Sequence, residues 1–330
     1  MKNILNYIGG EFLPAKSGEI LDNTDPSIGK VYGQLPRSNK DDVDLAVKNA
    51  ESAFTDWTNM PIDERSKLLL KISDEIENSL EELALAESID NGKPLNLSRS
   101  VDIPRAASNF RFFAHALTQF YGESHENQGL KSISNTLRKS RGIVGCISPW
   151  NLPLYLLTWK IAPALAAGNC VIAKPSEVTP MTAYLLSKIC KKAGLPDGVL
   201  NIVHGLGPEV GQAIVEHPKI KAISFTGGTK TGEHLARTAA PMFKKLSLEL
   251  GGKNPNIIFA DCDYEKMLKT TLRSSFANQG QICLCGSRIF IEESIYERFK
   301  HDFIECVSQL KIGHPINDDV NLGALVSESH

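Results

Sequence analysis

Residues 143–174 read IVGCISPWNLPLYLLTWKIAPALAAGNCVIAK, and this segment carries a pattern that later parts of the chain repeat. A short β-rich run, Ile143 to Ile147, leads into a proline-containing turn, then into a long apolar stretch and a second β-rich run, Val171 to Ala173. Because Lys160 and Pro163 interrupt the apolar stretch, a buried helix followed by a buried strand explains it better than a membrane span. Strand, helix and strand in this order predict a βαβ unit.

The alternation of strands and helices extends toward the C-terminus. Further β-rich runs lie at Leu200–Val203, Ile220–Phe225, Lys245–Leu250, Asn256–Phe259 and Gly286–Ile291. The spacing of apolar residues predicts helices at Met181–Ala193, Gly207–Val215, Tyr264–Phe276 and Ser294–Leu310, and in three earlier stretches that begin near Asp41, Pro61 and Val101. We therefore expect an α/β fold in which a parallel sheet is covered by helices on both faces. In such sheets ligands bind at the carboxyl ends of the strands.

Length and composition limit the class of protein. With 330 residues, of which 42% are hydrophobic and 22% charged, the chain is expected to form two domains. The formal net charge is −2, and no basic block or aromatic-basic stripe is present. This balance argues against a nucleic-acid partner or an anionic membrane surface, and it favours a small-molecule ligand. Residues Met1 to Phe12 lack the pattern of a secretory signal or membrane anchor.

The cysteines indicate a reducing compartment. There are seven of them, scattered through the chain at positions 146, 170, 190, 262, 283, 285 and 306. They form no C-x-x-C pair, so neither a zinc site nor a redox dithiol is expected, and no metal is predicted. Scattered, reduced thiols predict a cytoplasmic location.

Two segments near the C-terminal end supply a thiol and a carboxylate. Residues 276–283 read FANQGQIC, and residues 248–254 read LELGGKN. Glycines next to Cys283 and Glu249 allow the backbone to approach a ligand closely. Taken alone, Cys283 is typical of a small buried residue and Glu249 of a solvated one. Taken together, they predict a nucleophile and a general base.

Both segments resemble the two signature motifs of the NAD(P)-dependent aldehyde dehydrogenases. In that family the Cys and the Glu of these motifs are the catalytic pair. The turn at residues 148–153, SPWNLP, resembles a third motif, whose Asn supplies one arm of the oxyanion hole. A turn-forming Asn is the alternative explanation. The resemblance thus implies Cys283, Glu249 and Asn151 as catalytic residues, with Asn151 and Cys283 also contacting the substrate.

The resemblance also implies an architecture. It predicts a Rossmann-type, parallel-sheet NAD-binding domain at residues 1–248 and the first part of an α/β catalytic domain at residues 249–330. Residues 121–141 are expected to form a hairpin used in oligomerisation, since family members assemble as homo-oligomers, either dimers or tetramers.

Three turns after predicted strands suit a dinucleotide. Gly205–Gly211 has one residue too many for the G-x-G-x-x-G fingerprint, and Thr226–Gly232 lacks the Lys-Ser/Thr of an ATPase loop. The second turn can receive a pyrophosphate at a helix N-terminus, although an ordinary strand-to-helix turn has the same pattern. Lys174 and Glu177 suit ribose hydroxyls, with a surface ion pair as the alternative. A glutamate in this place would repel a 2′-phosphate, which favours NAD over NADP.

With the resemblance, the residues expected to bind NAD are Ile147, Ser148, Pro149, Trp150, Lys174, Ser176, Glu177, Gly207, Gly211, Phe225, Thr226, Gly227, Gly228, Gly232, Leu250 and Gly251.

The resemblance further implies the reaction and its substrate class. The Cys283 thiolate is expected to attack an aldehyde, and Glu249 to activate the water that hydrolyses the resulting thioester to a carboxylic acid. Residues 109–114, 148–169 and 281–285 look most like the enzymes of tryptophan breakdown that act on 2-aminomuconic semialdehyde, with the 2-hydroxymuconic semialdehyde enzymes close behind. In that subgroup an arginine binds the substrate carboxylate, and we expect Arg111 to match it. A helix-surface arginine is the alternative.

Two rival functions remain at this point. Family members continue well beyond residue 330, so the chain looks C-terminally truncated, and a catalytically inactive binding or interaction protein is one alternative. The other is a CoA-acylating aldehyde dehydrogenase, which does not need a hydrolytic glutamate; the presence of Glu249 argues against it.

Overall fold

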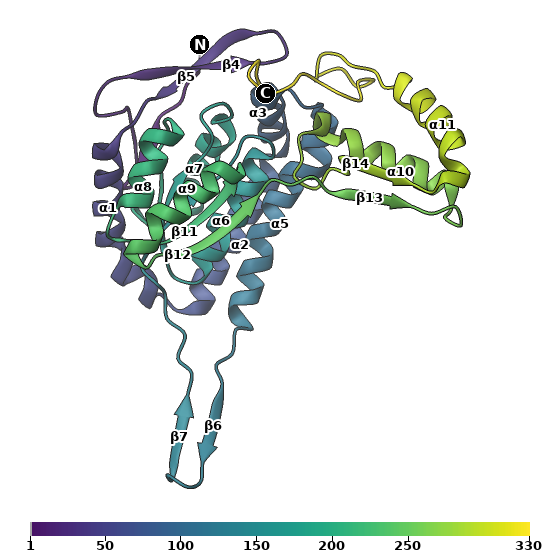
Figure 1. Ribbon diagram of the computed structural model, residues 1–330. Helices are drawn as coiled ribbons and strands as arrows, with labels where there is room; N and C mark the ends of the chain where they lie inside the picture. The colour runs from purple at the N-terminus through teal and green to yellow at the C-terminus, as the bar shows by residue number, and fades with distance from the viewer. Residues whose placement is uncertain (1) are drawn as a thin grey trace.

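A seven-stranded sheet organises the larger part of the chain in the computed structural model, which describes residues 2–330 (Figure 1). Its strands, in spatial order, are β12 (Lys245–Leu250), β11 (Ile220–Gly227), β8 (Ile143–Ile147), β9 (Cys170–Lys174), β10 (Leu200–Ile202), β2 (Asn6–Ile8) and β3 (Glu11–Leu13). The strands from β12 to β10 run parallel, and β2 and β3 add an antiparallel edge. The predicted parallel sheet is confirmed.

The order of the strands places a topological switch point between β8 and β11. The chain runs from β8 outward to β9 and β10, and then crosses to β11 and β12 on the other side of β8. Right-handed crossovers therefore put α6 (Pro153–Ala166) and α7 (Met181–Ala193) on one face of the sheet, and α8 (Gln212–Glu216) and α9 (Thr229–Ala239) on the other. In open sheets of this kind, ligands bind outside the carboxyl ends of the strands at the switch point.

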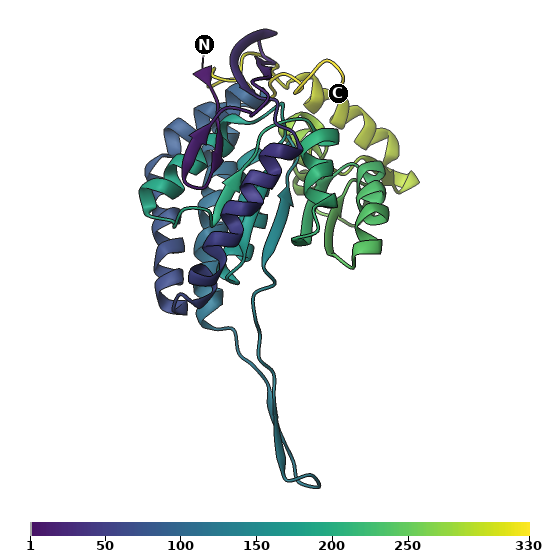
Figure 2. The same cartoon turned by 90° about the vertical axis from the view of Figure 1, so that its left-hand side faces the viewer.

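Further helices complete the two layers. Helix α1 (Lys40–Asn59) packs on β8, β9 and β10 (Figure 2). Helices α2 (Ile62–Asn78) and α5 (Ile103–Thr118) pack against each other, and α5 also lies along α6. Between α2 and α5 the chain forms α3 (Leu80–Asn91), the short turn α4 (Leu95–Leu97) and the π-helical turn η1 (Ser98–Asp102). One continuous apolar core joins these helices to the sheet.

Three smaller sheets extend from this body. Strands β1 (Lys2–Asn3), β5 (Lys30–Pro36) and β4 (Ile20–Asp25) form one of them. Strands β6 (Ser124–Asn127) and β7 (Ser132–Asn135) form a hairpin that projects away from the body, within the predicted segment 121–141 (Figure 1). The third sheet pairs β13 (Pro255–Ile258) with β14 (Arg288–Ile291).

The C-terminal unit surrounds the third sheet. Its helices are α10 (Tyr264–Phe276) and α11 (Tyr296–Ser308), with short 3-10 turns η4 (Ala277–Gly280) and η5 (Glu293–Ile295). Strand β12 runs to Leu250 and belongs to the large sheet, so Glu249 lies in that sheet and the connection between the two units follows it. Two further turns, η2 (Gly207–Gly211) and η3 (Ala240–Met242), flank α8 and α9. Within residues 2–330, no helix has both the length and the apolar character to cross a bilayer.

Two phenylalanines on α5 provide a test of the core. Phe110 is fully buried, whereas Phe112 is 60% exposed on the same helix. We expect Phe110→Ala to lower the free energy of unfolding by about 3–5 kcal/mol, because it leaves a cavity. Phe112→Ala should change it by about 0.5 kcal/mol or less. Chemical denaturation followed by circular dichroism measures both values, and equal losses would contradict the packing of α5.

Candidate active site

The carboxyl ends of four strands meet at one edge of the large sheet. Ile147 of β8 is in register with Lys174 of β9 and with Phe225 of β11. On the next strand, Glu249 of β12 is in register with Thr226. The structure therefore brings the predicted catalytic Glu249 to the same edge as the predicted cofactor residues.

A left-handed bend carries the thiol to this edge. Asn278, Gln279 and Gly280 have φ angles of 52°, 57° and 75°. Such conformations are costly for residues with a side chain, and they persist where the surrounding structure holds them. Asn278 is buried and its side chain donates hydrogen bonds to main-chain oxygens, which supplies that support.

Asn151 lies in direct contact with the segment that precedes Cys283. Its side-chain Nδ2 donates to the main-chain oxygen of Gln281 over 2.9 Å. In return, Asn278 Nδ2 donates to the main-chain oxygen of Asn151, also over 2.9 Å. An amide nitrogen carries two hydrogens, so Asn151 keeps a second donor for a ligand. The amide and the thiol, which come from two distant parts of the sequence, are thus held by one small network.

Cys283 differs from the buried cysteines of the sheet and helices. Its side chain is exposed, and Asn254 Nδ2 fixes the adjoining backbone by donating to the Cys283 oxygen over 2.6 Å and to the Cys285 oxygen over 3.1 Å. Burial raises the pKa of Cys146 and Cys190 to about 12, so those thiols are inert near neutral pH.

Two opposing influences act on the Cys283 thiol. Partial burial raises its pKa, and the Glu249 carboxylate adds to this effect. The backbone N–H groups of Cys283 and Leu284 lower the pKa in part. The thiol is therefore mostly protonated at neutral pH, and a base next to it increases its reactivity.

A groove runs beneath Glu249, between β12 and α6. It has a volume of about 440 Å³, and its walls include Phe113, Trp159, Lys160, Ser224 and Glu249. Burial lowers the pKa of Lys160, while Cys146 and Glu249 act in the opposite direction. A buried ammonium group thus lies close enough to Glu249 to interact with its carboxylate. The aromatic rings of Phe113 and Trp159 meet edge to face, with centroids 6.1 Å apart, and form an apolar wall.

The residues expected to bind a dinucleotide include polar groups without partners, and some of them border open space. Lys174 is buried, and its Nζ donates to Glu177 Oε2 over 2.8 Å and to the oxygen of Pro175 over 3.0 Å. The hydroxyls of Ser148 and Thr226 are buried without a hydrogen-bond partner. A Cβ atom added to some of the predicted glycines would have no neighbour within 4 Å: Gly207, Gly228 and Gly251.

Helix α9 begins at this edge with unsatisfied donors. Gly228 is its N-cap residue and provides no side-chain hydrogen bond to the first turn. The free N–H groups and the helix dipole are suited to an anionic group such as a phosphate. Gly232 has another use, because a Cβ there would lie 2.5 Å from Leu250, so this glycine allows α9 to pack against β12. For Gly227, an added Cβ would meet the Phe225 ring at 2.4 Å.

Comparison with known proteins identifies the family of this chain. The sequence profile of the aldehyde dehydrogenase family matches residues 12–330. The chain belongs to the aldehyde dehydrogenase family. It is 53% identical to 2-aminomuconic semialdehyde dehydrogenase of Mus musculus, over 98% of this chain and 66% of that protein. It is also 42% identical to 2-hydroxymuconic semialdehyde dehydrogenase of Pseudomonas sp. (strain CF600), over 100% of this chain and 69% of that protein.

The fold of this aldehyde dehydrogenase chain is also found in solved structures. An NAD+ complex of aldehyde dehydrogenase from Bacillus cereus superposes with a TM-score of 0.97 at 37% identity, covering 99% of this chain and 67% of that one. The chain spans about two thirds of the length of these relatives, for example 66% of the mouse protein.

The structure corrects the prediction for Arg111. Its guanidinium group pairs with Asp74 at 3.0 Å and with Glu77 at 2.6 Å, both on α2. These two carboxylates satisfy the arginine's charge and hold it toward α2, so it is the helix-surface arginine of the alternative explanation. Sequence spacing gave no sign of these partners, because they come from another helix.

Arg105, two turns earlier on α5, has the properties expected of Arg111. It is exposed, its guanidinium carbon lies 5.4 Å from the ring centroid of Tyr155, and its Nη2 donates to the Tyr155 hydroxyl over 3.3 Å. Tyr155 is in the first turn of α6, directly after the Asn151 loop. Within residues 2–330, no carboxylate forms an ion pair with Arg105. The sequence signal that could have identified it is only its position on the same helix.

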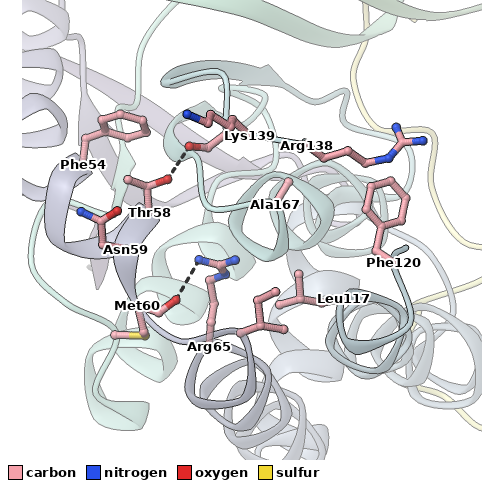
Figure 3. Close-up of a pocket in the computed structure, with 12 residues that line it drawn as sticks. Phe54, Thr58, Asn59, Met60, Arg65, Leu117, Phe120, Arg138, Lys139 and Ala167 are labelled. Atoms are coloured by element: carbon pink, nitrogen blue, oxygen red, sulfur yellow. Dashed lines mark hydrogen bonds between the residues drawn. The ribbon is translucent and has the colours of Figure 1, made fainter. Parts of the chain in front are cut away.

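A second hollow lies at the opposite edge of the sheet, near the base of the hairpin (Figure 3). It has a volume of about 620 Å³ and lies next to residues that precede β8. Arg65 extends into it, but its guanidinium donates to the main-chain oxygens of Ala166, Trp57 and Met60. Arg65 therefore joins the ends of α1 and α6, and the hollow contains none of the catalytic candidates.

The influence of Glu249 on the thiol is testable by alkylation. We expect the rate at which iodoacetamide modifies Cys283 to rise with pH beyond about 8.5, the ordinary pKa of a free cysteine. Glu249→Gln should shift this profile to lower pH, because it removes the negative charge that disfavours the thiolate. Mass spectrometry of the peptide measures the rate, and Cys283→Ser is the control. An unchanged profile in Glu249→Gln would contradict the proximity of the two groups.

Proposed function

We propose that this chain acts in the NAD-dependent oxidation of an aldehyde to a carboxylic acid. The observation that carries the proposal is the network that holds Asn151 against the segment leading to Cys283, with Glu249 close enough to influence the thiol. Nucleophile, amide donor and carboxylate are the parts that acyl chemistry through a thioester requires.

Each of the three side chains has a separate role. Cys283 Sγ adds to the aldehyde carbon and forms a thiohemiacetal. The Asn151 amide and the Cys283 backbone N–H donate to the oxygen that becomes negatively charged. After oxidation a thioester remains on Cys283, and Glu249 takes a proton from the water that attacks it. Lys160 lines the same groove as Glu249, and the Glu249 carboxylate favours the charged form of this lysine.

The residues at the switch point fit NAD. When bound, NAD supplies the hydride acceptor for this oxidation. Lys174 and Glu177 would hold ribose hydroxyls, and the N-terminus of α9 would receive the pyrophosphate. The unpartnered hydroxyls of Ser148 and Thr226 and the open space at Gly207 and Gly228 support this assignment. A carboxylate at Glu177 favours NAD over NADP, because it would repel a 2′-phosphate.

We assign 2-aminomuconic 6-semialdehyde as the substrate, in the tryptophan (kynurenine) pathway. The identity of 53% to a protein named for this activity supports the assignment, and 2-hydroxymuconic semialdehyde is the alternative. Such substrates carry a carboxylate. Arg105 is the cation available to bind it, because it has an open guanidinium beside the first turn of α6.

We also propose a homo-oligomer, either a dimer or a tetramer, which the projecting hairpin supports, and a cytoplasmic location, which the free cysteines support. Leu130, Ile133 and Leu137 are apolar residues of this hairpin and its base, and they are 75%, 69% and 80% exposed. Exposed apolar residues on a paired ribbon are typical of a contact surface.

Catalysis is tested by following NADH production from NAD and the semialdehyde. Cys283→Ala should abolish it, and Glu249→Gln should give one burst of NADH per active site before the rate stalls, because hydrolysis of the thioester is lost. Asn151→Ala should reduce the rate by about 10²–10³, as expected for one oxyanion donor. Wild-type rates in Cys283→Ala would refute the proposed function.

Substrate recognition is tested by a matched pair of arginines on α5. We expect Arg105→Ala to raise KM for the carboxylated semialdehyde at least about tenfold, since a charge-assisted hydrogen bond to the substrate carboxylate is lost. Its effect on an uncharged aliphatic aldehyde should be small. Arg111→Ala, which breaks only a surface pair with α2, is the control and should affect both substrates equally. Equal effects of Arg105→Ala on both substrates would contradict the assignment.

A further inference from the structure

Three ionisable side chains are buried together under the Asn151 loop. Glu87, on α3, and Lys93, shortly after this helix, both have no exposed surface, and Asp102 at the end of η1 is equally buried. Lys93 Nζ lies 2.6 Å from Asp102 Oδ2 and 3.8 Å from Glu87 Oε1. We call these three residues the Lys93 cluster. The sequence alone gives no sign of this cluster, because a lysine in a turn is usually solvated.

The Lys93 cluster and its neighbour Asn91 contact the main chain of the catalytic loop at three places. Asn91 Nδ2 donates to the oxygen of Trp150 over 2.9 Å. Lys93 Nζ donates to the oxygen of Asn151 over 3.0 Å. The N–H of Leu154 donates to the Glu87 carboxyl oxygens at 3.4 Å. One short segment, residues 87–93, therefore holds the loop from Trp150 to Leu154, in the first turn of α6.

The charges of the cluster are nearly balanced. Burial raises the pKa of Glu87 to about 8, although Lys93 opposes this effect. Lys93 and Asp102, 2.6 Å apart, form the ion pair of the cluster, and Glu87 lies further from Lys93, at 3.8 Å. Buried ion pairs seldom add net stability compared with apolar side chains of similar size. The contacts of Lys93 with the loop give a more specific reason for its presence.

We propose that the Lys93 cluster positions the oxyanion hole. The main-chain oxygen of Asn151 accepts hydrogen bonds from Lys93 and from Asn278, and these two bonds fix the orientation of the Asn151 peptide. The direction of the Asn151 side chain follows from that orientation. Lys93 is thus a positioning residue: it touches no reacting atom and acts through Asn151. This inference rests on the proposed function, in which the Asn151 amide binds the oxyanion.

The test removes the ion pair without leaving an unpaired buried charge. The double substitution Lys93→Met/Asp102→Leu keeps similar volumes and is expected to fold, since paired apolar replacements of buried ion pairs are tolerated. If the cluster positions Asn151, kcat for aldehyde oxidation should fall about 10²-fold, as for a misplaced catalytic group, while the Kd for NAD changes less than about twofold. Adding Asn151→Ala should cause little further loss, because both changes remove one function.

Outcomes that would overturn the proposal are equally specific. A folded double variant with the wild-type kcat would refute the positioning role. So would a combined variant with Asn151→Ala whose loss in kcat equals the product of the two separate losses. If the double variant fails to fold, Lys93→Arg is the second variant. It keeps the charge and the pairing with Asp102 but moves the donor, so the same fall in kcat is expected, and an unchanged kcat refutes the role. Lys192→Gln, which breaks the surface pair with Glu75, is the matched control.

A readout without turnover separates this proposal from the proposed function. Hydrogen exchange measured by mass spectrometry should rise in the peptide that covers residues 150–157 of the double variant, and stay unchanged in the hairpin at residues 121–141. If the wild type forms no NADH from any aldehyde, the proposed function fails, whereas the exchange result still decides whether Lys93 holds the loop. Unchanged exchange at residues 150–157 refutes the positioning role.

Discussion

The pair of hydrogen bonds between the Asn151 loop and residues 278–281 is the constraint on which the site depends. Asn151 belongs to the large sheet's βα turn, whereas Asn278 and Gln281 belong to the C-terminal unit. Each segment donates one hydrogen bond to the other and accepts one in return, so neither segment can shift without breaking a bond to the other. Because the left-handed backbone at Asn278 and Gln279 is unfavourable by itself, this exchange also stabilises the bend that delivers Cys283.

Much of the fold could be predicted because buried parallel strands are continuous apolar runs. The strands at Ile143–Ile147 and Lys245–Leu250 were found at their observed bounds. The short strands β1 to β5 were missed, since they are only two to seven residues long and buried polar residues such as Asn6 and Asn23 interrupt their apolar pattern. The predicted helix at Gly207–Val215 divides into a π-helical turn and α8, a change of hydrogen-bond spacing that apolar periodicity does not encode.

The residues of the candidate site could likewise be predicted only in part. Cys283, Glu249 and Asn151 stand in local motifs, and their types suit the proposed chemistry, so they could be chosen as candidates from the sequence alone. Arg111 illustrates the limit: its carboxylate partners lie on α2, and only the packing of α2 against α5 reveals them. Lys93 is the reverse case, because a lysine that follows Asn-Gly is expected to be exposed, whereas Lys93 is fully buried. Tertiary contacts determine where a charged side chain lies, and the spacing of residues in the sequence does not predict those contacts.

The hairpin of β6 and β7 has a consequence for how the chain behaves as a free subunit. Every residue of both strands is exposed, and a two-stranded ribbon without a hydrophobic face is only marginally stable in water. Contact with a second subunit, as in the proposed oligomer, would add to its stability. For the proposed oligomer, the rate at which a protease cleaves this ribbon would therefore report how much of the population is associated.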